Sequence, residues 1–124
     1  MAEFEKDLLT EKIIACCFKV HRDLGPGFPE RVYHRALIIL FDREGIKYHS
    51  EREFEILFEN FRVGSFRCDL LVEEKVIMEL KSVTGIMPIL FRNKLISHLK
   101  AAKIKTGLLV NFGNKSCDVK RIAN

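Results

Sequence analysis

Two short apolar runs with a helical stretch between them constrain the fold of this chain more than any other feature. Residues 76–81 and 106–112 read as strands, and the second is apolar enough to be buried on both faces of a sheet. Between them, residues 89–103 carry an apolar stripe that includes Leu95 and Leu99, which predicts a helix. This order indicates a strand–helix–strand crossover in an α/β domain.

The first 45 residues predict two helices. Apolar residues recur at helical spacing after Thr10, so we expect a helix over residues 10–24 that Thr10 caps and Gly25 ends. After a Gly-Pro-Gly-Phe elbow, Pro29 suits the first position of a second helix, which should stop at Gly45. The tight connection implies that the two helices pack against each other or on one face of a sheet.

The middle of the chain has the alternation of strands. Residues 54–58 alternate phenylalanine and isoleucine with glutamate, and a longer strand is expected over residues 62–72. The polar residues 73–75 form a turn before the strand at 76–81, so three sequential strands suggest an antiparallel meander. Residues 117–122 can add a short edge strand. We therefore predict a mixed sheet of four to five strands, flanked by helices on both faces.

Composition excludes several classes of protein. A chain of 124 residues, 48% of them hydrophobic and 31% charged, is expected to form one globular domain over residues 1–124. No apolar run is long enough to cross a bilayer, and the N-terminus is acidic where a secretory signal would be basic, so we expect a cytoplasmic protein without membrane contact. The four cysteines include no Cys-x-x-Cys pair, which argues against zinc.

The distribution of charge is uneven. The net charge is only +4, but lysine and arginine dominate after Arg92, where Asp118 is the only acidic residue. A basic C-terminal third predicts weak, non-specific binding to DNA or RNA. A solvated lysine surface is the commoner explanation of such a run.

Two acidic residues lie within the apolar strands. Buried strands seldom carry acids without compensation, yet Asp69 and Glu79 occur in such segments. If residues 73–75 form a three-residue hairpin loop centred on Glu74, these two residues lie opposite each other with Cβ atoms about 5 Å apart. A loop of two or four residues would instead place them on opposite faces. Lys81 points to the same side as Glu79, since the two residues are two positions apart.

An aspartate, a glutamate and a lysine in this arrangement suit the hydrolysis of phosphodiesters. Carboxylates supply hard oxygen ligands for Mg²⁺ or Mn²⁺, which polarise phosphate and activate water. A lysine can hold that water or stabilise the developing charge. The alternative is a pair of surface acids with an ordinary Glu–Lys contact, and the residue types alone leave both interpretations open.

Glu30 is the third acid of interest. It falls in the first turn of the second helix, where backbone N–H groups favour an anion, and complementing that helix end is its commoner role. Tyr33 lies three residues further on the same side of the helix, where it can be a core residue, a hydrogen-bond donor or both.

These residues carry a family resemblance. Residues 27–33 fit the pattern Gly-x-x-Glu-x-x-Tyr, and Asp69, the Glu79-x-Lys81 pair and the apolar segment 107–113 follow in order. The chain resembles the GxxExxY protein family, a small branch of the PD-(D/E)XK nuclease-like superfamily. The resemblance implies the restriction-endonuclease-like fold with an αβββαβ core, which agrees with the order of elements derived above.

The resemblance also implies roles. Glu30, Asp69 and Glu79 would bind Mg²⁺ or Mn²⁺, and the same acids with Lys81 would form the catalytic set of a nuclease. Relatives carry a Gln-x-x-x-Tyr pair on the helix after the third strand, where this chain has Lys94 and His98. Lys94 could contact a phosphate and His98 could keep a hydrogen bond, or the site has decayed. The alternative function is therefore a non-catalytic nuclease-fold domain that binds nucleic acid or a partner protein, a second copy included.

Overall fold

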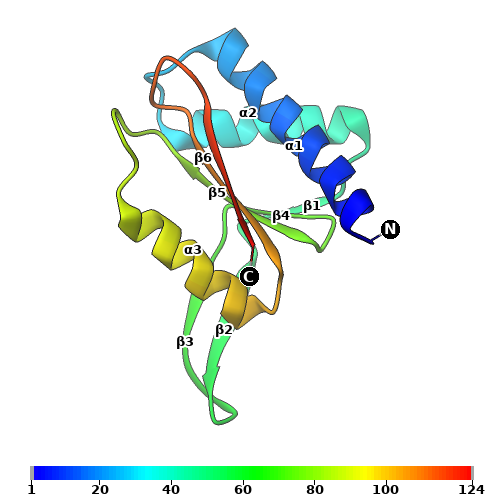
Figure 1. Ribbon diagram of the computed structural model, residues 1–124, viewed down its shortest axis with the longest axis vertical. Coiled ribbons are helices and arrows are strands. Elements are labelled where there is room, and N and C mark those ends of the chain that lie inside the picture. Colours follow the sequence, from blue (N-terminus) through cyan, green and yellow to red (C-terminus); the bar gives the residue numbers. More distant parts are fainter. Residues whose placement is uncertain (1, 124) are drawn as a thin grey trace.

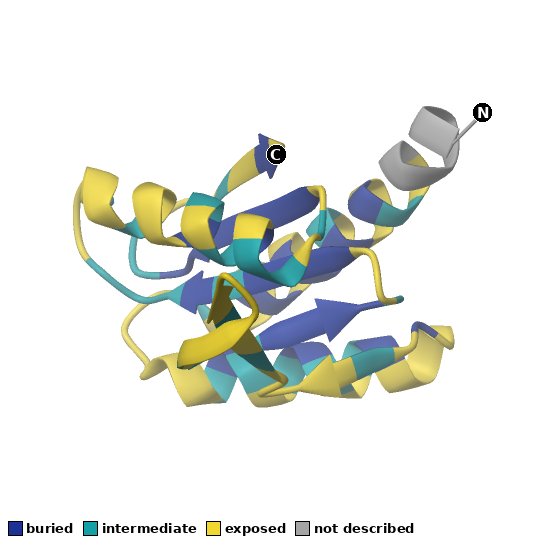
Figure 2. Cartoon of the chain, turned by 90° about the horizontal axis from the view of Figure 1, so that it is seen from below, coloured by how far each residue is buried: buried dark blue, intermediate teal, exposed yellow. Residues whose placement is uncertain are grey.

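A mixed β-sheet lies between two layers of helices in the computed structural model, which describes the backbone of residues 2–123 and the side chains of residues 8–123 (Figures 1 and 2). Within this range the main sheet has the strand order β1-β4-β5-β6-β7. Its strands are β1 (Tyr48–Ser50), β4 (Leu70–Val72), β5 (Val76–Lys81), β6 (Thr106–Asn111) and β7 (Asp118–Ala123). β5 and β6 are parallel, and the other neighbouring pairs are antiparallel. The predicted mixed α/β fold is confirmed.

Helices cover both faces of this sheet, as the sequence predicted. α1 (Ala2–Leu24) and α2 (Glu30–Glu44) pack on one face, and α3 (Ile89–Ala102) packs on the other. The central strands β4, β5 and β6 are mainly dark blue between the partly yellow helices in Figure 2, because the middle of the sheet is buried on both sides. In the part of the chain that the structure describes, no helix is long and apolar enough to cross a membrane.

Side chains of β5 alternate between the two layers. Val76, Met78 and Leu80 belong to the core under α1 and α2, whereas Ile77 belongs to the core under α3. Since successive side chains of a strand point to opposite faces, Glu79 and Lys81 share the α3 face with Ile77.

α3 lies close to β6 because of Gly107. A Cβ atom at this position would come within 3.0 Å of the Leu95 side chain, so only glycine leaves room for the helix at its present distance. The βαβ unit made of β5, α3 and β6 is the one predicted from the two apolar runs.

The N-terminal helix is longer than predicted. α1 begins at Ala2, and Thr10 is a buried residue inside the helix instead of its cap. The expected cap was wrong because residues 2–9 are mostly good helix formers and continue the helix upstream. The other ends are where they were expected: Gly25 (φ +74°) follows α1 and Gly45 (φ +70°) caps α2. Pro29 is the N-cap of α2, one position before the predicted place.

The predicted three-stranded meander is wrong. β2 (Glu53–Phe58) and β3 (Phe61–Arg67) form a separate two-stranded hairpin that projects from the body of the molecule (Figure 1). The long strand expected over residues 62–72 breaks at Cys68 and Asp69, where backbone hydrogen bonds to residues 51 and 52 turn the chain into the main sheet. β4 then pairs with β1, a strand too short to predict from its pattern.

Candidate active site

The candidate site lies where β4 begins, beside β5. The β4–β5 hairpin has the predicted three-residue loop, with Leu70 opposite Met78 and Leu71 opposite Ile77. Glu79 shares the α3 face with Ile77, and Asp69 occupies a bend directly before β4. Two hydrogen bonds place the two acids side by side, and their facing each other on one side of the sheet stays a prediction.

Each of the two carboxylates accepts a hydrogen bond from a backbone N–H group at, or directly after, the other acid. The Asp69 N–H donates to Glu79 Oε1 at 3.0 Å, and the Leu80 N–H donates to Asp69 Oδ2 at 2.6 Å. Before Leu70 the chain no longer pairs with β5. The N–H groups of Asp69 and Leu80 therefore need acceptors other than the carbonyl groups of a paired strand. The acids therefore replace a ladder of backbone bonds, which fixes their orientation and gives them a structural role.

The surroundings raise the pKa of Asp69. Burial is the largest cause, and the charges of Glu79 and Glu30 act in the same direction. The hydrogen bond from Leu80 and the charge of Lys81 oppose them, and the pKa of Asp69 is about 6. At neutral pH the environment thus makes ionisation of the Asp69 carboxyl cost free energy, and a bound cation would offset that cost.

Glu30 reaches the site from the other layer of helices. It is exposed at the first position of α2, near enough for its charge to raise the pKa of Asp69. The elbow before it is fixed by Tyr33, whose hydroxyl donates to the Gly25 carbonyl at 2.6 Å and accepts from the Phe28 N–H at 3.2 Å. The Tyr33 ring is fully buried and stacks on Phe112, with centroids 4.4 Å apart and planes 4° apart. Tyr33 is therefore both a core residue and a hydrogen-bond donor.

Lys81 stands at the end of β5 on the same face as Glu79. Its Nζ lies 4.3 Å from the centroid of the Phe91 ring, at the start of α3. A cation on the face of an aromatic ring is attracted by the ring quadrupole. Phe91 therefore contacts the ammonium group, whose charge is near enough to lower the pKa of Asp69. Nothing in the sequence pattern indicated this role of Phe91.

His98 contacts the site, and Lys94 lies one helical turn before it. The His98 ring stacks on Phe66, with centroids 4.0 Å apart and planes 7° apart, and its Nδ1 is 3.7 Å from Glu79 Oε2. Lys94 is exposed, and as it is four residues from His98 it lies on the same side of α3. The sequence did not indicate Phe66 as a residue of the site, because its partner His98 lies on a different element.

The donor set fits a hard divalent cation. Within residues 8–123 no group of three or more His, Cys, Asp or Glu side chains forms a ready-made metal site, so Asp69 and Glu79 stand as a pair with Glu30 further out. The backbone N–H groups engage Oδ2 of Asp69 and Oε1 of Glu79, which leaves Oδ1 of Asp69 to a ligand, while Oε2 of Glu79 faces His98 Nδ1 at 3.7 Å. Mg²⁺ is commonly bound through one or two carboxylates, with water and substrate phosphate completing its octahedron.

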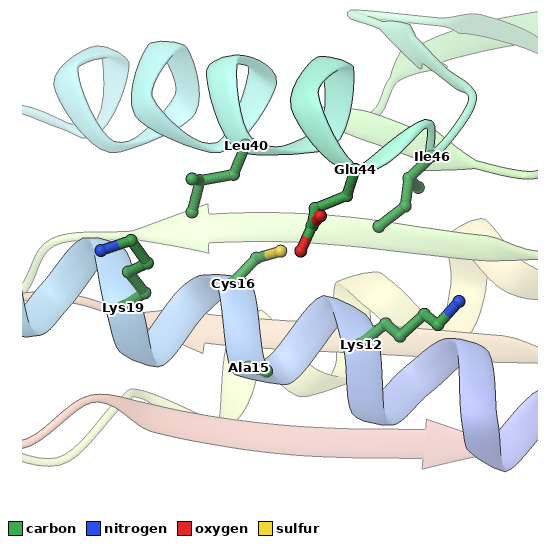
Figure 3. A pocket seen from close by; sticks show the side chains of 7 residues that line it. All are labelled: Lys12, Ala15, Cys16, Lys19, Leu40, Glu44 and Ile46. Carbon is green, nitrogen blue, oxygen red and sulfur yellow. The ribbon is translucent and has the colours of Figure 1, made fainter.

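Neither the cysteines nor the pocket between α1 and α2 belongs to this site. Burial raises the pKa of the Cys68 thiol to about 12, which removes it as a nucleophile beside Asp69. A pocket of about 390 Å³ lies between α1 and α2, across the sheet from Glu79 (Figure 3). Its lining combines small and apolar side chains with charged ones: Lys12, Ala15, Cys16, Lys19, Leu40, Glu44 and Ile46. We find no chemistry in it that relates to the acids.

Comparisons with known proteins agree with the fold. The family model described as the PD-(D/E)XK nuclease superfamily matches residues 7–122. The solved structure titled "Crystal structure of SSO0001" is 17% identical in sequence, with a TM-score of 0.57 over 76% of this chain and 49% of that one. The chain thus spans about half the length of that protein, and the likeness shows the fold alone. No curated protein matches the chain.

Proposed function

This chain belongs to the PD-(D/E)XK nuclease superfamily, and we propose that it is a divalent-metal-dependent nuclease that hydrolyses phosphodiester bonds in DNA or RNA. The observation that supports this most directly is the adjacency of Asp69 and Glu79, with Lys81 on the same face of β5 as Glu79. Its place in the GxxExxY branch is part of the proposal, and rests on the motif that holds Glu30 and Tyr33.

Each residue has a distinct part in the proposed reaction. Mg²⁺ or Mn²⁺, when bound, would polarise the phosphate and lower the pKa of a water molecule. Asp69 and Glu79 would hold the cation, and Glu30 would complete the acidic set directly or through water. Lys81 would orient the attacking water or stabilise charge on the phosphate, since its charge is near enough to lower the pKa of Asp69.

Lys94 and His98 would replace the usual Gln and Tyr in different ways. His98, packed between Phe66 and Glu79, would act on the metal through the orientation of Glu79. Lys94 would offer a positive charge to a phosphate on the same side of α3. Both are positioning or binding roles, so neither residue needs to touch the reacting atoms.

A second candidate function is nucleic-acid or protein binding without cleavage. Its support is the pair of backbone hydrogen bonds, which gives Asp69 and Glu79 a structural reason to exist without any metal. A vestigial site could keep these acids for folding alone.

Cleavage of short single- and double-stranded oligonucleotides with Mn²⁺ separates the two functions. Asp69→Asn and Lys81→Ala should each lower the rate by about 100-fold or more, since each removes a group that stabilises the transition state. Lys81→Ala should still bind Mn²⁺ in calorimetry, whereas Asp69→Asn should bind it weakly. Lys100→Ala, which removes an exposed lysine from α3, is the matched control and should cut normally. If the parent protein cleaves no faster than Asp69→Asn, the nuclease proposal is wrong and binding without cleavage replaces it.

A further inference from the structure

Four exposed apolar side chains lie around the Lys81 end of the site. Phe28 is 45% exposed, Ile86 95%, Ile89 71% and Leu90 60%. We call these residues the apolar lip. Single exposed apolar residues are ordinary, but several in one region next to a candidate site indicate a binding surface.

The chain places the lip beside the acids. The Ser82 hydroxyl, directly after Lys81, donates to the Phe28 carbonyl at 2.8 Å and so joins the elbow before Glu30 to the end of β5. Leu90 precedes Phe91, the residue that contacts the Lys81 ammonium group. The lip is thus contributed by the elbow before α2 and by the start of α3, both next to the end of β5.

The loop that presents Ile86 is held by side chains. The Val83 N–H donates to Asn111 Oδ1 at 2.9 Å, and Asn111 Nδ2 donates back to the Val83 carbonyl at 3.0 Å. Asn114 makes the same two bonds to Gly85, at 2.7 and 2.8 Å. Ile86 therefore extends into solvent directly after a backbone segment that two asparagine side chains hold in place.

The segment from the end of β5 into α3, which carries most of the lip, is positive, whereas Phe28 lies two residues before Glu30. Between Glu79 and Asp118 the sequence contains no acidic residue, while it contains Lys81, Arg92 and Lys94. Leu90, Lys94 and His98 follow at intervals of four residues, so they line one side of α3 from the lip to Glu79. A nucleic acid complements this charge with its phosphates, and it complements the lip with its bases.

We propose that the lip binds the unpaired bases of a single-stranded nucleic acid, so that the site acts on single strands or on unpaired ends. The inference rests on the proposed function for its class of ligand. A duplex hides its bases and presents charged phosphates, which isoleucine and leucine side chains cannot satisfy. A single strand offers both base faces and backbone, and proteins bind it by stacking bases on aromatic side chains along a basic groove. Phe28 is the aromatic residue of the lip, and its isoleucine and leucine residues add apolar surface for the bases.

Binding measured in EDTA tests this without cleavage. The probes are a fluorescent oligothymidylate of roughly 20 nucleotides, a duplex of that length, and an abasic strand with the same number of phosphates. The parent protein should bind the oligothymidylate about tenfold more tightly than the other two, since each base contact adds to phosphate attraction. Ile86→Ser combined with Ile89→Ser should remove that preference and leave the affinity for the abasic strand unchanged.

Ile39→Ser is the matched control, because Ile39 is a 57% exposed isoleucine of α2 outside the lip. It should bind all three probes like the parent. Equal affinity of the parent for the three probes, or a preference that survives in the double variant, would overturn the inference. A double variant that changes only self-association in solution would assign the lip to a second copy of this chain, and would overturn it too.

The two proposals can fail separately. Base-dependent binding without any Mn²⁺-dependent cleavage would support base binding by the lip and contradict the nuclease proposal. Equal cleavage of duplex and single strands, unaffected by the double variant, would support the nuclease proposal and contradict base binding by the lip.

Discussion

Asp69 combines two roles that are usually assigned to different residues. Its carboxylate accepts the Leu80 N–H at the point where β4 begins, and the same group is the central acid of the candidate metal site. Both roles need the ionised form and favour a low pKa, whereas burial and the neighbouring acids raise the pKa.

This conflict predicts how stability depends on pH. The pKa of Asp69 rises from 3.8 to about 6 on folding, so the folded protein binds the proton more tightly than the unfolded chain. The resulting stabilisation is complete below the unfolded pKa of 3.8 and is lost as the pH rises through about 6. In EDTA, the free energy of unfolding should therefore fall by about 1–2 kcal/mol between acidic and neutral pH, after allowance for partial exposure.

Asp69→Asn removes the titrating group and keeps an oxygen that can accept the Leu80 N–H. Denaturation with urea should show a flatter pH dependence and, at neutral pH without metal, a variant more stable than the parent by about 1 kcal/mol. The same slope in parent and variant would mean that another group titrates.

At the scale of the elements, the loops after β5 and β6 form one unit. Gly113 allows this, because a Cβ atom there would lie within 2.6 Å of the backbone N, C and O atoms of Val83. Asn111 then connects the two loops by the hydrogen bonds that hold Val83. The end of β5 that carries Lys81 is thus positioned by residues about 30 positions later in the chain.

Gly113→Ala should disturb this unit. The backbone of Val83 has no room to yield without breaking its bonds to Asn111, so we expect a loss of about 1–3 kcal/mol in unfolding free energy. Cleavage should fall as well, because Lys81 would be displaced. Gly64→Ala in β3 is the matched control, since its Cβ would meet only Ile56 Cδ1 at 3.8 Å. Equal melting temperatures for the two variants would contradict the close approach.

For the whole molecule, a bound cation should act as a folding ligand. Asp69, Glu79 and Glu30 come from three separate elements, so the unfolded chain cannot bring them together. Mg²⁺ or Mn²⁺ should therefore raise the melting temperature by mass action, by an amount equivalent to about 2.7 kcal/mol at 100 times the dissociation constant.

Scanning calorimetry against increasing Mn²⁺ measures this effect, and Asp69→Asn should reduce it strongly. Lys100→Ala should keep it, because Lys100 lies exposed on α3 away from the acids. A melting temperature independent of Mn²⁺ in the parent would remove the metal site.

The sequence by itself determined the features that depend on neighbours along the chain. The three-residue turn after β4 was enough to predict the register of the β4–β5 hairpin, and the alternation in β5 was enough to place Glu79 and Lys81 on one face, because the side-chain period of two is fixed by backbone geometry. Gly25 and Gly45 likewise ended their helices where predicted, since only glycine adopts a positive φ there at low cost.

Only the tertiary structure decided which distant segments meet. The pairing of β1 with β4, the separation of the β2–β3 hairpin and the contact of His98 with Glu79 depend on partners far along the chain. Local patterns carry no record of such partners: Phe66 reads only as the apolar residue of a strand, and Phe91 only as part of a helix. Their positions against His98 and Lys81 follow from how α3 packs on the sheet, which the whole core sets at once.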